Sequence, residues 1–204
     1  MTRFHALPAA LRAGVIAAFL GVSSVAATAQ AGGGNVLPSN ARPKGYSLAD
    51  AAAATAVFDT GPHDATPPKL PFYTLVNDAT VKPGTTLYVP IFHLDDSGED
   101  AGKLPADVTD QQAAADYLMD FVKDAFDVDA FIIVVDGKVT VLDDSNIHGL
   151  NTAPLLDGPP AGTKYIVAGA FLTPLTPGTH TVSIGGIIDG EPVEFVTNTV
   201  TVTH

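Results

Sequence analysis

Cysteine and tryptophan are both absent from the 204 residues of this chain, and methionine occurs only twice. Without cysteine there is no disulfide, no thiolate metal ligand and no cysteine nucleophile. Stability must therefore come from a packed core, which a chain of this length is large enough to build without covalent cross-links. The lack of tryptophan also disfavours a carbohydrate-binding module, because sugar-binding platforms rely on tryptophan and tyrosine rings.

Basic residues are scarce as well. Lysine and arginine number 10 against 22 aspartates and glutamates, which gives a formal net charge of −12 at pH 7. Binding to nucleic acid requires clustered lysine and arginine to neutralise phosphates, so we expect no nucleic-acid partner. The same balance disfavours anionic membrane surfaces, and its simplest consequence is solubility.

Catalytic and phosphate-binding motifs are missing too. The chain has no G-x-S-x-G, H-E-x-x-H, P-loop or G-x-G-x-x-G pattern. Scattered serine, histidine and aspartate residues could form a triad, but nothing in their spacing requires one. A secreted hydrolase with paired carboxylates in a cleft stays open as an alternative, since the sequence alone cannot pair the acids.

The longest apolar run lies at the N-terminus and is shorter than the roughly 20 residues that a membrane-spanning helix needs. Arg3 and Arg12 precede this run, and the small-residue triplet Ala27-Thr28-Ala29 follows it. This order is typical of a signal peptide over residues 1–29 that is cleaved after Ala29. We therefore expect export to the periplasm or the outside of the cell, with no membrane span in the mature chain. An uncleaved N-terminal anchor is the alternative.

Glycine and polar residues follow in a stretch that predicts a flexible leader over residues 30–45, and residues 46–204 then form a single domain. The domain begins with an alanine-rich segment, residues 47–58, which predicts a short helix. Ser47 is its expected cap, and Asp50 three residues later favours the positive helix end.

From residue 72 onward most of the chain has β character. Asp136-Gly137 and Asp189-Gly190 each lie between runs rich in valine and isoleucine, so each predicts a two-residue hairpin turn. Pro83-Gly84 predicts a further turn, and Pro90 interrupts an apolar run in the way an edge strand or a bulge does. Residues 109–126 are the exception, because apolar side chains there follow a helical period.

The helix predicted over residues 109–126 begins with Thr109 and Gln112, which fit a T-x-x-Q capping box. Strands in series with turns between them and only one or two short helical insertions predict a mainly β fold. The specific fold expected is an antiparallel immunoglobulin-like β-sandwich.

The stretch 171–186, FLTPLTPGTHTVSIGG, predicts a corner followed by a strand. Pro177-Gly178 makes a tight turn, and alternation begins at His180. The pattern resembles the corner before strand F in fibronectin type III and immunoglobulin-like domains, where a tyrosine bonds back to the upstream backbone. His180 takes that position here, so we expect a structural role for its ring. A metal ligand or a general base is the functional alternative.

A wider resemblance extends from Gly45 to about Val182. It rests on GYSLADAA, LPFYTL, VKPGTTLYVPIFHLDDS, VDGK, PLLDG and GAFLTPLTPGTHTV, in this order. The chain resembles a group of secreted bacterial proteins, most of them known only as hypothetical proteins. The resemblance implies export and a β-sandwich, and it implies no activity, substrate or catalytic residue.

The acidic loop 93–100, HLDDSGED, holds the best candidate ligands for a metal ion. Oxygen ligands gathered in a loop suit Ca²⁺. The candidate metal ligands are His93, Asp95, Asp96, Glu99 and Asp100, with Ser97 between them. The loop does not match an EF-hand, which needs glycine where Asp100 stands and glutamate where Ala106 stands. A transition-metal site that joins His93 and His180 is a second alternative.

These observations together predict an exported, monomeric, non-enzymatic protein that binds a ligand or a component of the cell envelope. No other cofactor is expected. A calcium-binding or other divalent-metal-binding protein that uses loop 93–100 is one alternative, and a secreted hydrolase is the other.

Overall fold

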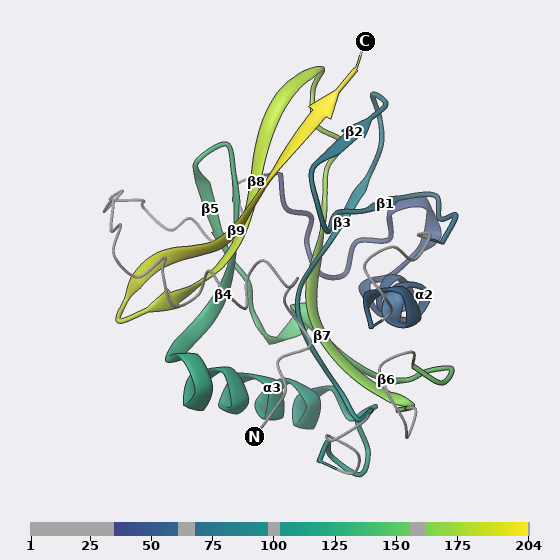
Figure 1. Cartoon of the computed structure of the whole chain (residues 1–204), viewed down its shortest axis with the longest axis vertical. Coiled ribbons are helices and arrows are strands. Elements are labelled where there is room, and N and C mark those ends of the chain that lie inside the picture. The colour runs from purple at the N-terminus through teal and green to yellow at the C-terminus, as the bar shows by residue number, and fades with distance from the viewer. Residues whose placement is uncertain (1–34, 61–67, 98–102, 156–161, 204) are drawn as a thin grey trace.

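A computed structural model describes residues 35–60, 68–97, 103–155 and 162–203 of the chain. In these residues the fold is mainly β, with two sheets and two α-helices (Figure 1). This confirms the prediction of a mainly β fold in which helices are insertions. The predicted signal peptide, residues 1–29, lies outside the described residues.

The first sheet has four strands in the order β1-β3-β7-β6. Its members are β1 (Tyr73–Thr74), β3 (Leu87–Asp95), β7 (Lys164–Leu172) and β6 (Ile147–Asn151). The second sheet has five strands in the order β2-β9-β8-β4-β5. Its members are β2 (Ala79–Val81), β9 (Glu191–Val202), β8 (Gly178–Ile188), β4 (Val128–Val135) and β5 (Lys138–Val141).

The strand pairs are antiparallel except at one edge of each sheet. β1 pairs parallel with β3, and β2 pairs parallel with β9, so the prediction of a wholly antiparallel arrangement is wrong at these edges. Both short strands belong to residues 73–81, which run beside one sheet and then the other before β3 begins. Sequence alternation shows that a segment is extended, but it does not show which edge that segment joins.

One large cluster of buried apolar side chains draws on both sheets and on helix α3 (Gln111–Phe126). Val89 of β3, Ile133 of β4 and Val182 of β8 are among its members, and Leu118 comes from α3. Since side chains alternate between the faces of a strand, each of these strands turns its other residues away from this core. Figure 1 shows α3 below the lower end of β4.

Helix α2 (Leu48–Asp59) packs on the four-stranded sheet. Ala52 and Ala56 contact Tyr165 and Val167 of β7, while the start of the helix joins the aromatic cluster of Phe72, Tyr88 and Phe171. Because alanine side chains are small, the helix backbone can lie close to large side chains of the sheet such as Tyr165. The predicted cap is confirmed: Ser47 and Asp50 form a reciprocal capping box.

The start of α3 differs by one residue from the prediction. Asp110, not Thr109, is the cap, and its carboxylate accepts hydrogen bonds from the backbone N–H groups of Gln112 and Ala113. Thr109 bonds instead to the side chain of Asp107, at 2.9 Å from its backbone nitrogen. A carboxylate that accepts two amide hydrogens also complements the positive end of the helix, which explains why aspartate takes this position.

The predicted Asp-Gly hairpin turns and the turn at Pro83-Gly84 are confirmed, whereas the tight turn predicted at Pro177-Gly178 is only a bend, because Gly178 already begins β8. Asp136 and Gly137 have φ values of 50° and 79° between β4 and β5, and Asp189 and Gly190 have 53° and 80° between β8 and β9. Positive φ at both central residues is the requirement of a type I′ hairpin turn. The irregularity expected at Pro90 is a bulge, because the register between β3 and β7 shifts between Pro90 and Phe92.

Residues 35–37, within the segment predicted as a leader, lie beside the end of β7. Val36 forms an isolated bridge with Leu172, and the Leu37 backbone nitrogen donates to the Phe171 carbonyl at 2.8 Å. The 3-10 helix η2 (Pro43–Gly45) then leads into α2.

Gly149, in β6, lies against the backbone that precedes α3. A Cβ atom added there would stand 1.9 Å from the Val108 carbonyl oxygen, closer than any real contact. We therefore expect Gly149→Ala to destabilise the fold by at least the roughly 1–3 kcal/mol typical of overpacking. Chemical denaturation measures this loss, with Asn151→Ala at the exposed end of the same strand as the control. Equal stability of the two variants would contradict the close approach.

Candidate functional site

The acidic segment after β3 forms a turn that uses its own carboxylates. Asp95 is buried, and its Oδ1 atom accepts hydrogen bonds from both the backbone nitrogen and the hydroxyl of Ser97. The backbone contact measures 2.9 Å. Ser97 is wholly buried as well. Much of the hydrogen-bonding capacity of Asp95 is therefore used to close the turn.

Asp96 joins this turn to the beginning of β7. Its Oδ1 atom accepts hydrogen bonds from the backbone nitrogens of Thr163 and Lys164, both at 2.8 Å. Gly162 allows the approach, because a Cβ atom there would lie only 2.6 Å from the same oxygen. The Asp96 carboxylate thus links two segments that are far apart in the sequence.

The candidate ligand His93 is buried in β3, where its ring lies against that of Tyr165 with ring centroids 5.1 Å apart. The other two candidate metal ligands, Glu99 and Asp100, lie outside the described residues. Among the residues that the structure describes, no three histidine, aspartate or glutamate side chains gather closely enough to hold a metal ion. Calcium binding by loop 93–100 therefore stays a prediction.

His180 lies at the start of β8, with its side chain 13% exposed. Its Nε2 atom is 2.8 Å from the carbonyl oxygen of Thr176, four residues upstream. This is the bond to the upstream backbone that the corner pattern predicts. The sequence did not reveal the second contact: Nδ1 lies 2.7 Å from the carboxylate of Asp136, in the β4–β5 turn. Both ring nitrogens are engaged, which does not favour the alternative role of His180 as a metal ligand.

Asp136 has a role beyond its turn. Its other oxygen, Oδ1, accepts from the backbone nitrogen of Thr181 at 2.9 Å. The hydrogen bond to Asp136, followed by that to Thr176, raises the pKa of His180 above its ordinary value. Partial burial raises the pKa of Asp136, but the hydrogen bonds from His180 and Thr181 outweigh burial and lower it.

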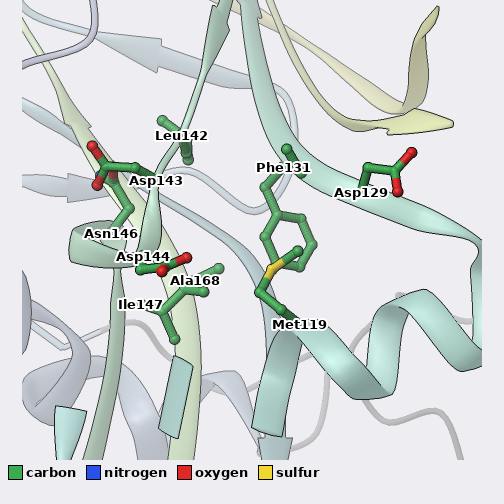
Figure 2. A pocket seen from close by; sticks show the side chains of 10 residues that line it. Met119, Asp129, Phe131, Leu142, Asp143, Asp144, Asn146, Ile147 and Ala168 are labelled. Atoms are coloured by element: carbon green, nitrogen blue, oxygen red, sulfur yellow. The ribbon is translucent and has the colours of Figure 1, made fainter. Parts of the chain in front are cut away.

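A small cavity lies near the end of the sheets that α3 approaches, and three aspartates line it (Figure 2). Its volume of about 40 Å³ holds only one or two water molecules, whereas pockets for organic ligands measure roughly 300–1,000 Å³. Figure 2 shows the Phe131 ring and Met119 between Asp129 and the other two acids, Asp143 and Asp144. The cavity is therefore too small for a substrate, and its acids do not face one another across it.

Two of these aspartates are also engaged elsewhere. The Lys123 ammonium lies 2.9 Å from Asp129, and Asp143 accepts from the Ser145 backbone nitrogen at 2.9 Å. The salt bridges of Lys123 with Asp127 and Asp129 raise its pKa. This geometry fits the fold's own turns better than the paired carboxylates of a hydrolase.

Sequence reasoning missed a polar surface on the five-stranded sheet. Six threonines on β2, β8 and β9 occupy the face opposite the buried side chains of Val182, Val200 and Val202. We call this surface the threonine face; its members are Thr80, Thr179, Thr181, Thr197, Thr199 and Thr201. All are exposed except Thr201, which is half-buried.

The rows of the threonine face are in register. Thr179 pairs with Thr201, Thr181 pairs with Thr199, and Thr80 lies beside Thr201 on the outer strand. The alternating threonines of residues 197–203 were the signal in the sequence, but only the register brings β8 and β2 beside them. Carboxylates lie beside the threonine face: Asp78 accepts from the Thr199 backbone nitrogen at 2.7 Å, and Glu194 accepts from the Thr197 hydroxyl at 3.3 Å.

His148 on β6 is another residue that sequence reasoning passed over. Its Nδ1 atom lies 3.2 Å from Oε1 of Gln111, and its Nε2 atom is buried with no hydrogen-bond partner in the described structure. Burial lowers the pKa of His148, which favours the neutral form of its ring.

Comparisons with known proteins do not assign a family. No protein-family model matches the chain, and the curated proteins include no match to it. Among the described residues, no helix has the length and apolar character needed to cross a membrane.

The two aspartates after β3 separate a structural role from calcium binding. Asp96→Ala loses two bonds to backbone amides, so we expect a loss of about 1–3 kcal/mol in the free energy of unfolding. A structural role predicts the same loss in chelator and in calcium, measured by thermal denaturation. Asp124→Ala, an exposed change on α3, is the control. A calcium-dependent rise in melting temperature that Asp95→Asn/Asp96→Asn abolishes would instead establish a calcium site.

Proposed function

We propose that this protein is exported and acts by binding a component of the cell envelope, not by catalysis. We further propose that the two sheets form an immunoglobulin-like β-sandwich and that the chain is cleaved after Ala29. The resemblance to secreted bacterial proteins agrees with this proposal. The observation that carries it is the exposed threonine face, a regular surface that no described element covers. The acidic groups of the candidate sites, in contrast, bond to the protein's own backbone.

The sandwich proposal rests on the core. Side chains from strands of both sheets belong to one buried cluster, as expected where two sheets pack face to face. His180 is bonded to the backbone just before its strand, in the manner of the corner in immunoglobulin-like domains. The short parallel strands β1 and β2 are the departures from that pattern.

The binding proposal rests first on how the ionisable groups are used. Asp95, Asp96 and Asp136 accept backbone hydrogen bonds, and the cavity in Figure 2 has no room for a substrate. A hydrolase needs an acid and a base free to face a bound molecule. These groups do not favour the hydrolase alternative.

The threonine face is the surface that we assign to binding. Threonine is β-branched and stiff at χ1, so paired threonine rows present hydroxyls in a nearly fixed arrangement. A hydroxyl both donates and accepts hydrogen bonds, which suits a polar ligand without requiring charge. A rigid surface also loses little side-chain entropy when it binds.

Export is tested by the N-terminus of the protein recovered outside the cytoplasm. Cleavage after Ala29 predicts Gln30, or the pyroglutamate formed from it, as the first residue in mass spectrometry. Replacing Ala29 with a large charged residue, as in Ala29→Arg, should block this cleavage, because signal peptidase requires small residues there. A chain that retains Met1 in a membrane fraction would support the uncleaved anchor instead.

Binding is tested with purified peptidoglycan sacculi as the probe. We expect the wild-type protein to co-sediment with sacculi and Thr179→Lys/Thr199→Lys to lose at least about tenfold in affinity, because lysine disrupts the uncharged rows. Asn151→Lys/Ala153→Lys carries the same added charge at the exposed end of β6 and just beyond it, away from the threonine face, and should bind as the wild type does. Equal binding by the threonine variant, or no binding by the wild type, contradicts the proposal. Soluble fragments released in proportion to time would indicate a hydrolase.

A further inference from the structure

The His180 ring connects three parts of the chain that meet at one end of the five-stranded sheet. The ring belongs to β8, Nδ1 reaches Asp136 in the β4–β5 turn, and Nε2 reaches the Thr176 carbonyl in the connection from β7. Asp136 also accepts from the Thr181 backbone nitrogen, so the carboxylate holds the beginning of β8 twice.

Both partners of the ring are hydrogen-bond acceptors. A backbone carbonyl can only accept, and an ionised carboxylate can only accept. A neutral imidazole carries one N–H group and can satisfy one of them, whereas an imidazolium carries two and can satisfy both. With distances of 2.7 Å and 2.8 Å, both contacts have the lengths of made hydrogen bonds.

We propose that His180 is a pH-dependent latch, which as an imidazolium ties the β7–β8 connection to the β4–β5 turn and releases the connection when it loses a proton. The neutral ring keeps one of its two bonds, and the Thr176 carbonyl or the Asp136 carboxylate then lacks a donor. Within the connection, Thr173 donates from its backbone nitrogen to the Asn35 carbonyl and Leu175 lies in the main buried cluster, so the part that this loss frees is the exposed end at Thr176 and Pro177.

Among the groups that contact the His180 ring, Asp136 is the charged one, and its carboxylate favours the protonated ring. The turn presents the Asp136 carboxylate, the connection presents the neutral Thr176 carbonyl, and β9 places the uncharged Val200 opposite His180. The neighbouring Thr181 contributes only its backbone amide and hydroxyl, both of which face Asp136. No lysine or arginine is among the groups that contact the ring in the described residues.

The direction of the pH dependence follows from the raised pKa of His180. The stabilisation is complete below the pKa of the unfolded chain, about 6.5 for histidine, and is lost as the pH rises through the higher pKa of the folded chain. The latch is therefore closed in mildly acidic solution and opens as the pH rises through the raised pKa of His180.

The test compares three full-length proteins by thermal denaturation and NMR between pH 5 and pH 9. His180→Gln cannot become charged, so the wild-type advantage in melting temperature over this variant should be largest near pH 5 and should decline as the pH rises. In the wild type, NMR titration should show the His180 ring protonating with a pKa above 6.5, the ordinary value for histidine.

Asp136→Asn is the matched variant. Asparagine followed by glycine suits a type I′ turn at least as well as aspartate does, so the turn itself is preserved. Its neutral amide no longer favours the imidazolium, and the His180 titration should move to lower pH by a measurable amount. A wild-type advantage that does not depend on pH, a His180 pKa at or below 6.5, or an unchanged titration in Asp136→Asn would each overturn the latch. None of these outcomes depends on ligand binding, so they are separate from the test of the proposed function.

Discussion

Burial of alternating apolar side chains is the constraint on which the rest of the structure depends. The chain has no disulfide, so the shared cluster of the two sheets and α3 must supply most of its stability. Large buried residues such as Tyr165 and Phe171 sit on the other face of the four-stranded sheet, where the alanine-rich helix α2 covers them. Each sheet therefore has one face committed to the common core, and the two differ in what lies on the opposite face.

That difference explains the distribution of polar groups. The four-stranded sheet is covered by α2, and carboxylates such as Asp96 link its own strands, because Asp96 follows β3 and bonds to the backbone where β7 begins. On the five-stranded sheet, β8, β9 and β2 present threonines outward instead. The excess of acidic residues is partly explained by this structural use, because a carboxylate satisfies backbone N–H groups at turns and helix starts where no strand or helix partner exists.

His180 is a further example of a polar side chain whose bonds serve the fold. It occupies a corner that the backbone geometry requires, and it is polar because the corner leaves a carbonyl that needs a donor. Its second contact, with Asp136, turns a local corner into a tertiary link between the β4–β5 turn and β8. A tyrosine in the same position would supply only one donor, so histidine adds a bond and, with it, a dependence on protonation.

Local features were predictable from the sequence because they depend on neighbouring residues. The turns at Asp136-Gly137 and Asp189-Gly190, the cap at Ser47 and the β class follow from backbone preferences and from alternation within a few residues. Even the error at Thr109 is local, since Asp110 beside it is an equally good cap and accepts two amides instead of one.

Tertiary structure decided everything that joins distant residues. The parallel pairing of β1 and β2, the contact of Asp96 with Thr163, the link from His180 to Asp136 and the register of the threonine rows all join residues that alternation cannot relate. The candidate metal ligands illustrate the limit most clearly. Composition brought His93, Asp95 and Asp96 to notice, but folding places a buried ring and two turn-forming carboxylates there. A sequence determines which chemical groups are available, whereas their hydrogen-bond partners depend on which strands lie side by side once the core has formed.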